Sequence, residues 1–206
     1  MNLVDDYLMV TNLIPKELCK SLILESSHLK WEKHSWYDYK KDNIISSQTK
    51  EAETVLSTAK QFEQITKYLV EALINYQKKY SIKGDKTEGK WINKITPIKF
   101  VRYAVGTHMH QHYDHIQSIF DGQLKGIPII SIVGLLNDNY KGSLLKFPRQ
   151  NFDNKDIPKG WSMVWPSTVT HPHETTPLKK GTKYTLSSWS HPPSWSHEEM
   201  GGSIKR

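Results

Sequence analysis

The sequence predicts one α+β domain that is mainly β, with a β-sandwich or jelly-roll core. The first observation is the length, because 206 residues suffice for a single domain with a core of its own. The second is that long helical patterns lie before about residue 80. The third is that short β-rich runs, separated by Gly, Pro, Asn and Asp, follow residue 96.

The N-terminal part is expected to begin with a strand over residues 3–10. A helix from about Pro15 to Ser26 should follow, because proline suits the first helical turn and apolar residues then recur on one face. Residues 30–38 mix aromatic and polar side chains, as a half-buried strand does.

A long helix is expected from about Thr58 to Tyr80, since apolar residues recur there mostly at intervals of three and four. Such a stripe indicates core packing rather than a cofactor site. Its members are Phe62, Ile65, Leu69, Ala72, Leu73 and Tyr76. The strands expected after this helix cover residues 97–105, 127–137, 143–147, 161–166, 168–174 and 182–190.

The composition indicates an intracellular, cytoplasmic protein. The single Cys19 cannot form an internal disulfide. The N-terminal residues Met1–Asp6 are acidic where a signal peptide would be basic, and the longest apolar run is too short to cross a bilayer. We therefore expect no membrane partner. The domain should occupy residues 1–190, with its core over 96–190, and residues 191–206 should form a flexible tail.

The net charge of +7 comes partly from lysines between Lys78 and Lys99. A nucleic acid or another polyanion could bind such a segment. However, lysine is mostly a surface residue, and the sequence contains no helix-turn-helix pattern or aromatic RNA-binding signature. We therefore prefer a solvated helix end and polar loop, and do not expect a nucleic-acid partner.

The stretch "THMHQHYDH" from Thr107 to His115 concentrates residues that commonly bind metals. If it is extended, its side chains alternate between two faces. Four of them then share one face and indicate a metal site, while His115 points the other way. The four are His108, His110, His112 and Asp114.

Two metal sites fit this pattern. Non-haem iron oxygenases bind iron with two histidines and one carboxylate, so an HxD pair would need one distant histidine from "THPHE", His171 or His173. Alternatively, His108, His110 and His112 could hold zinc. The spacing alone does not separate these two possibilities.

Several motifs at fixed spacings separate these two possibilities. Arg102-Tyr103, Gly106 and the HxD of His112 and Asp114 lie at the positions that they occupy in prolyl 4-hydroxylases. The later histidine of that family is followed at fixed distances by Pro, Gly, Lys and Trp. Counted from His173, these residues are Pro177, Gly181, Lys183 and Trp189. The chain thus resembles the iron(II)- and 2-oxoglutarate-dependent dioxygenases, specifically their prolyl 4-hydroxylase-like branch, over most of its length.

This resemblance implies a double-stranded β-helix (jelly-roll) core with the N-terminal helices packed on one sheet. It implies that His112, Asp114 and His173 are the catalytic iron ligands, and that Lys183 binds the far carboxylate of 2-oxoglutarate. Tyr103 and Ser131 could add hydrogen bonds to that carboxylate. The cofactors implied are Fe(II), 2-oxoglutarate as cosubstrate and O2, with ascorbate as a further candidate reductant.

The function implied is hydroxylation with release of succinate and CO2, with peptidyl proline as the expected target. Alternatives are the same chemistry on a free amino acid, another side chain or a nucleobase, and a non-catalytic jelly-roll that binds only metal or ligand. We expect His108 and His110 to face a peptide or protein substrate. We expect the same of Trp36, as part of an aromatic N-terminal wall.

Overall fold

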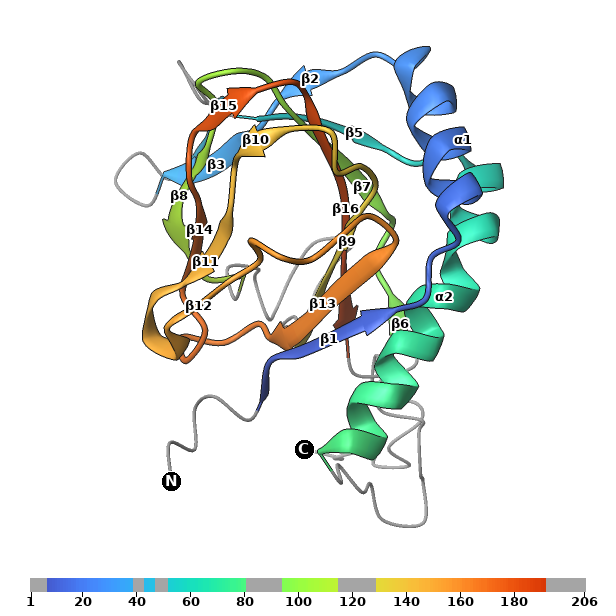
Figure 1. The fold of residues 1–206 in the computed structure, drawn as a ribbon, viewed down its shortest axis with the longest axis vertical. Helices are drawn as coiled ribbons and strands as arrows, with labels where there is room; N and C mark the ends of the chain where they lie inside the picture. The colour runs from blue at the N-terminus through green and yellow to red at the C-terminus, as the bar shows by residue number, and fades with distance from the viewer. Residues whose placement is uncertain (1–6, 39–42, 47–51, 81–93, 115–128, 192–206) are drawn as a thin grey trace, which may run out of the picture.

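The computed structural model describes residues 7–38, 43–46, 52–80, 94–114 and 129–191. Its strands form a larger and a smaller sheet that enclose a common interior, and two long helices run along the outer side of the larger sheet (Figure 1). The predicted fold, a mainly β domain with a jelly-roll core and N-terminal helices on one sheet, is confirmed.

The larger sheet has eight strands in the order β1-β13-β9-β16-β7-β5-β2, and β6 also pairs with β16. Every pairing in it is antiparallel. The strands are β1 (Met9–Asn12), β2 (Glu32–Lys33), β5 (Glu53–Leu56), β6 (Lys94–Ile95), β7 (Lys99–Tyr103), β9 (Ile130–Leu135), β13 (Trp161–Pro166) and β16 (Lys183–His191).

The smaller sheet has four strands in the order β12-β11-β14-β8. They are β8 (Met109–His112), β11 (Leu145–Phe147), β12 (Phe152–Asp153) and β14 (His173–Thr175). A short 3-10 helix, η2, separates β11 from β12. This helix covers Pro148–Gln150. Two further antiparallel pairs are also described. One joins β3 (Ser35–Asp38) to β4 (Asn43–Ser46), and the other joins β10 (Lys141–Gly142) to β15 (Leu178–Lys180).

The helices are α1 (Lys16–Ser27) and α2 (Ala59–Lys79). Pro15 occupies the N-cap position of α1. The start of α2 is fixed by a capping box, in which the Thr58 hydroxyl accepts from the Gln61 backbone N–H and the Gln61 side chain accepts from the Thr58 backbone N–H. The residues predicted to be core are buried in α2, except Phe62, which is half-buried.

The hydrophobic core has separate layers on the two sides of the larger sheet. On the outer side, the buried face of α2 packs with apolar residues that include Phe100, Ile132 and Leu186 of the sheet. On the inner side, Leu135 and Trp165 of the larger sheet pack with Phe147 of the smaller one. The central strands are therefore covered on both faces, which agrees with the mostly apolar sequences of β9 and β13.

Most observed strands start or end within a few residues of the predicted bounds, and two differ more. The first strand is Met9–Asn12 instead of residues 3–10, because its position is set by pairing with β13, where Met9 lies opposite Val164. The strand predicted over 168–174 begins only at His173, since the backbone N–H of His171 turns back to the carbonyl of Thr168. Residues 1–6 lie outside the described part of the chain.

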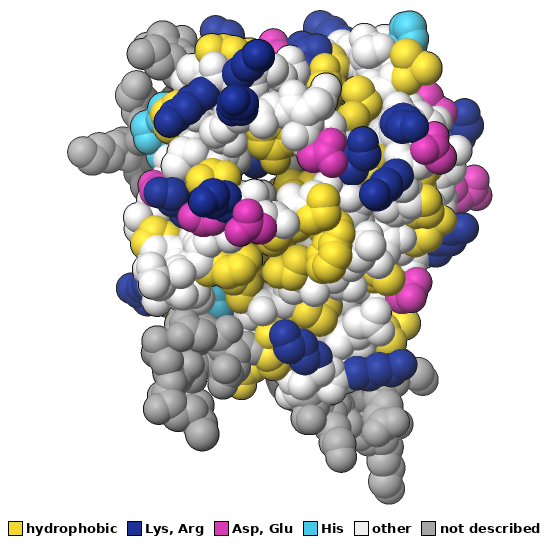
Figure 2. Space-filling view, viewed as in Figure 1, with side chains coloured by type: hydrophobic (Ala, Val, Ile, Leu, Met, Phe, Trp, Pro, Cys, Tyr) yellow, Lys and Arg dark blue, Asp and Glu magenta, His cyan; other side chains and the backbone are white. Residues whose placement is uncertain are grey.

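The surface shown in Figure 2 carries basic side chains interspersed with acidic ones. The lysine-rich segment singled out in the sequence lies mostly at residues 81–93, outside the described residues, as does the expected tail from 192 onward. Among the residues described, neither helix combines the length and the apolar character needed to cross a bilayer.

Candidate metal centre and adjoining cavity

Two strands of the smaller sheet bring the candidate ligands together. His112 at the end of β8 pairs directly with His173 at the start of β14, and their ring centroids are 4.4 Å apart. Asp114 follows β8 by two residues. Its Oδ1 lies 3.8 Å from His112 Nε2 and its Oδ2 lies 3.7 Å from His173 Nε2.

These separations exceed those of hydrogen bonds, and the three ligand atoms all lie within 4.8 Å of one another. Two imidazole nitrogens and one carboxylate oxygen facing a common point form the donor set of a 2-His-1-carboxylate iron site. No alternative cluster of three such donors occurs within the described ranges. The zinc arrangement of His108, His110 and His112 is thus not assembled here.

Backbone carbonyls orient both rings. The His112 Nδ1 lies 2.7 Å from the carbonyl of His110, and the His173 Nδ1 lies 3.0 Å from the carbonyl of His171. A carbonyl can only accept, so each Nδ1 carries the proton and each Nε2 keeps a lone pair directed at the common point. The Phe147 and Trp165 rings pack beside His173, at centroid distances of 5.5 and 5.0 Å.

The protonation states suit a divalent ion. Burial, with a smaller contribution from His173, lowers the pKa of His112 to about 4. Burial alone would raise the pKa of Asp114, but His173, His112 and the hydrogen bond from Ser131 together lower it. Near neutral pH, His112 is therefore neutral and Asp114 is ionised, which are the forms that bind metals.

Asp114 is fixed by two side chains. The Ser131 hydroxyl donates to Oδ2 at 2.6 Å and contacts the Ser167 hydroxyl at 2.8 Å. The Trp189 side chain also hydrogen-bonds to Asp114. The structure thus places Ser131 at the carboxylate of the triad, and its expected hydrogen bond to the cosubstrate remains a prediction.

Lys183 lies at the start of β16 with only 1% of its surface exposed. Its ammonium donates to the Ser143 carbonyl and lies 5.2 Å from the Tyr103 ring centroid and 5.6 Å from that of Tyr140. Burial lowers its pKa to about 7. An inward-facing ammonium without a carboxylate partner among the described residues suits an anion, so the outward-facing alternative is excluded.

One cavity connects these groups. It encloses about 140 Å³, about ten times the roughly 10–15 Å³ that one water molecule requires. The three triad residues, Lys183, Tyr103 and Ser131 all line it. Apolar walls come from both sheets, through residues such as Leu135, Leu145 and Trp165.

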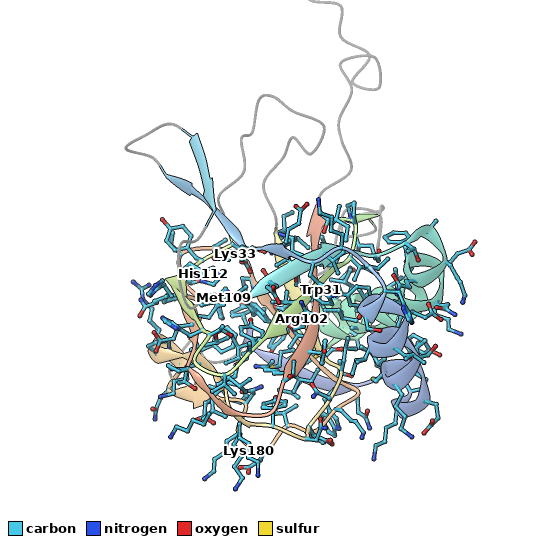
Figure 3. All side chains as sticks on the ribbon, turned by 90° about the horizontal axis from the view of Figure 1, so that it is seen from above. Trp31, Lys33, Arg102, Met109, His112 and Lys180 are labelled. Carbon is cyan, nitrogen blue, oxygen red and sulfur yellow. The ribbon has the colours of Figure 1, made fainter. Side chains whose placement is uncertain are left out.

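The expected common face of His108, His110 and His112 is interrupted. Between β8 and β14, Met109 pairs with Thr175 and His112 pairs with His173, so the register shifts between the two pairs. Met109 and His112, both labelled in Figure 3, line the cavity as a result. His108 and His110 are absent from its lining. The latter two rings pack edge to face at 4.6 Å, and contact with substrate remains a prediction for them.

The expected aromatic wall is only partly described. Trp31 packs against Tyr184 and under the Arg102 guanidinium, 4.5 Å from the ring centroid, and does not line the cavity (Figure 3). Trp36 lies on β3, but its side chain is outside the part that the structure describes. Its role toward a substrate also remains a prediction.

The sequence reasoning missed two titratable residues of the cavity, His34 and Lys99. Lys99 could have been found, because it precedes Tyr103 by four residues on a predicted strand and therefore shares its face. His34 carried no comparable signal, since it reaches the cavity through the pairing of the N-terminal strand β2 with β5.

Comparison with known proteins supports the same class of site. Residues 98–191 match the family described as the 2OG-Fe(II) oxygenase superfamily. This match confirms the resemblance found in the motifs. The chain is 37% identical over 57 residues to human procollagen-lysine,2-oxoglutarate 5-dioxygenase 2 and 35% identical over 57 residues to the rat 5-dioxygenase 1. Each match covers 28% of this chain but 8% of the relative.

The fold is similar to those of solved prolyl hydroxylases. A viral collagen prolyl hydroxylase from Paramecium Bursaria Chlorella virus-1 has a TM-score of 0.60 and 17% identity, covering 90% of this chain and 95% of the viral one. A Pseudomonas putida prolyl-4-hydroxylase has a TM-score of 0.61 and 16% identity, with 91% and 96% covered. A Trichoplax adhaerens prolyl hydroxylase, solved with a hypoxia inducible factor peptide fragment, has a TM-score of 0.62 and 15% identity, with 96% and 88% covered.

Proposed function

We propose, from the match of residues 98–191 to the 2OG-Fe(II) oxygenase superfamily, that this protein is an iron(II)- and 2-oxoglutarate-dependent hydroxylase. The observation that carries the proposal is the convergence of His112, Asp114 and His173 in a cavity that also contains the buried Lys183. When bound, iron and 2-oxoglutarate would supply the oxidation by dioxygen that hydroxylates a substrate and releases succinate and CO2.

The chain's own residues would bind and orient the reactants. His112, Asp114 and His173 would hold the ion and leave its remaining positions open. The Lys183 ammonium would exchange its hydrogen bond to the Ser143 carbonyl for the far carboxylate of 2-oxoglutarate. Tyr103 pairs with Lys183 across β7 and β16 and lies at the same end of the cavity.

The surrounding residues would keep the site rigid and dry. Ser131 and Trp189 hold the Asp114 carboxylate in one orientation, and the backbone carbonyls of His110 and His171 hold the two rings. The apolar walls would exclude water from the reacting centre. Whether ascorbate acts as a reductant remains a prediction.

The substrate that we propose is a prolyl residue of a peptide, hydroxylated at carbon 4. The similar solved folds are those of prolyl hydroxylases, one of them with a bound peptide fragment. A second candidate is peptidyl lysine, which is favoured by the 37% identity to a procollagen-lysine dioxygenase. Lys99 argues against it, because a second ammonium in the same cavity would repel a lysyl side chain.

A turnover assay tests the proposal. The protein is mixed with Fe(II), 2-oxoglutarate and a panel of proline- or lysine-containing peptides, and succinate and peptide mass are measured. We expect a proline peptide to gain one oxygen atom and to raise succinate formation, and Asp114→Ala to abolish both. Succinate formation with a free amino acid or nucleotide alone would reject the peptide substrate. No succinate under any condition would favour the non-catalytic alternative.

A further inference from the structure

Lys99 contributes an ammonium to the cavity that the proposed chemistry does not use. Along β7, Lys99, Val101 and Tyr103 line the cavity, while Phe100 belongs to the core under the helices and Arg102 pairs with Glu53. This is the alternation of a strand with one face toward the interior. Lys99 therefore points inward because of its position on β7.

The surroundings of Lys99 contain little compensating charge. Its Nζ lies 5.3 Å from the Trp189 ring centroid. Within the described residues, its side chain makes no ion pair or hydrogen bond. Burial lowers its pKa, and Asp114 opposes this effect. Asp114, which lines the same cavity, is thus a nearby negative charge that favours the ammonium form.

His34 lines the same part of the cavity without supplying a negative charge. Burial, and then the charge of Lys99, lower its pKa to about 3, so its imidazole is neutral at ordinary pH. His34, Lys99 and the three triad residues all line this one cavity. This part of the cavity therefore contains a cation, a neutral imidazole and the indole of Trp189.

Metal binding would remove the compensation that Lys99 receives. The charges of a divalent ion, of Asp114 and of the other carboxylate of 2-oxoglutarate would sum to zero, so Lys99 would no longer face a net negative charge. The far carboxylate of 2-oxoglutarate is assigned to Lys183 in the proposed function. The Lys183 Nζ lies beside the Tyr103 and Tyr140 rings, whereas the Lys99 Nζ lies beside the Trp189 ring. The backbone positions of the two lysines, opposite Tyr103 and Ser187, are also four residues apart along the strands, or roughly 13 Å.

We propose that Lys99 binds a carboxylate of the substrate, next to the carbon that is hydroxylated, with Trp189 and His34 flanking it. This inference rests on the proposed hydroxylase function and specifies its substrate class. The carboxylate could belong to an Asp or Glu side chain beside the target residue, or it could be the α-carboxylate of an amino acid. Both present the same charge and geometry to an ammonium.

Calorimetric titration of a complex that cannot turn over tests this assignment without an activity measurement. The protein is first loaded with Zn²⁺, which has no redox chemistry, and then with 2-oxoglutarate. It is next titrated with pairs of probes that differ only in charge. One pair is the end-blocked peptides Gly-Pro-Glu and Gly-Pro-Gln, and the other is L-proline and L-prolinamide.

The wild-type complex should bind the carboxylate member of one pair about 10- to 150-fold more tightly than its amide, the range for a charge-assisted hydrogen bond. The pair that shows the preference identifies the source of the carboxylate. Lys99→Met, which keeps the length of the side chain, should bind both members equally, and Lys99→Arg should keep the preference.

Two exposed lysines serve as controls for net charge. Lys33 lies on β2 next to His34, and Lys180 lies on the side of the molecule remote from His112 (Figure 3). Lys33→Met and Lys180→Met should keep the preference. Equal binding of acid and amide by the wild type, no binding of either carboxylate, or a preference that survives Lys99→Met would overturn the proposal. Failure of Zn²⁺ or 2-oxoglutarate to bind in the loading steps would instead count against the proposed function.

Discussion

At the scale of single residues, the candidate centre depends on charges that the protein holds in their metal-binding forms. Each triad histidine has its Nδ1 directed at a carbonyl two residues earlier, and Asp114 accepts a hydrogen bond from Ser131. These contacts orient the donor atoms before an ion arrives. The ligands and the residues that orient them should therefore respond differently to substitution.

Asp114→Asn should reduce the affinity for Co²⁺ or Mn²⁺ by more than about 100-fold, because it removes the charged ligand. Loss of a residue that only hydrogen-bonds to a ligand and orients it reduces metal affinity by about 10- to 100-fold. His110→Ala should leave the affinity within a few-fold of the wild type, since the backbone carbonyl of His110, which the substitution keeps, holds the His112 ring. Metal titration followed by absorbance or calorimetry measures both. Metal loss in His110→Ala with retention in His112→Ala would show that the ligand assignment is wrong.

Lys183→Met should weaken 2-oxoglutarate binding by about 10- to 150-fold, as expected for a charge-assisted hydrogen bond worth about 1.5–3 kcal/mol. Metal affinity should change little. Thermal stability should be unchanged or higher, because the substitution removes a fully buried ammonium whose pKa burial has lowered to about 7. Unchanged 2-oxoglutarate affinity in calorimetry would remove Lys183 from the cosubstrate site.

At the scale of elements, irregularities in the strands aim the functional groups. The register shift between β8 and β14 brings Met109 and His112 to the same cavity. At the end of β10, Gly142 has a φ of +82° and Ser143 a φ of +49°, and the Ser143 carbonyl accepts from Lys183. This turn therefore couples the pairing of β10 with β15 to the position of the Lys183 ammonium.

Gly142→Ala and Gly106→Ala form a matched pair, because both glycines have a φ above +80°. A left-handed conformation costs a residue with a Cβ about 1–2 kcal/mol, so both should lose that much in free energy of unfolding. Gly142→Ala should lose about 1–3 kcal/mol more, since its Cβ would lie 2.5 Å from the Pro177 carbonyl oxygen, while a Cβ at Gly106 meets nothing within 4 Å. Urea unfolding compares them, and equal losses would show that the β10 turn can relax.

At the scale of the whole molecule, folding buries three histidines in forms that resist protonation. Burial is the main cause in each case, and it lowers the pKa of His112 and His171 to about 4 and that of His34 to about 3. An unfolded chain would protonate them near pH 6.5. Since the unfolded state then binds more protons than the folded state, stability must fall as the pH falls below 6.5.

For the metal-free protein, the contribution of these histidines to the free energy of unfolding should be complete above about pH 7 and should decrease between pH 6.5 and pH 4. Each histidine should contribute a slope of up to about 1.4 kcal/mol per pH unit. Urea unfolding at pH 7, 6 and 5 measures it. His171→Gln should reduce the dependence of the free energy of unfolding on pH by the contribution of one histidine. A stability that rises on acidification would contradict the burial of these groups in neutral form.

The sequence by itself determined the order of helices and strands, the amphipathic face of α2 and the motifs that place His112, Asp114, His173 and Lys183. These are local or fixed-distance features, because helical periodicity and motif spacing are properties of neighbouring residues. They were sufficient to predict the jelly-roll class and the oxygenase resemblance, both confirmed by the fold and the family match.

Only the tertiary structure decided which side chains share the cavity. A register shift overrode the simple alternation that had grouped His108 and His110 with His112. The antiparallel pairing of β7 with β16, and that of β2 with β5, brought Lys99 and His34 to the cavity from distant parts of the chain. Pairing and register depend on partners remote in sequence, and a one-residue shift changes the face that each side chain occupies, so residue types and spacing alone do not fix them.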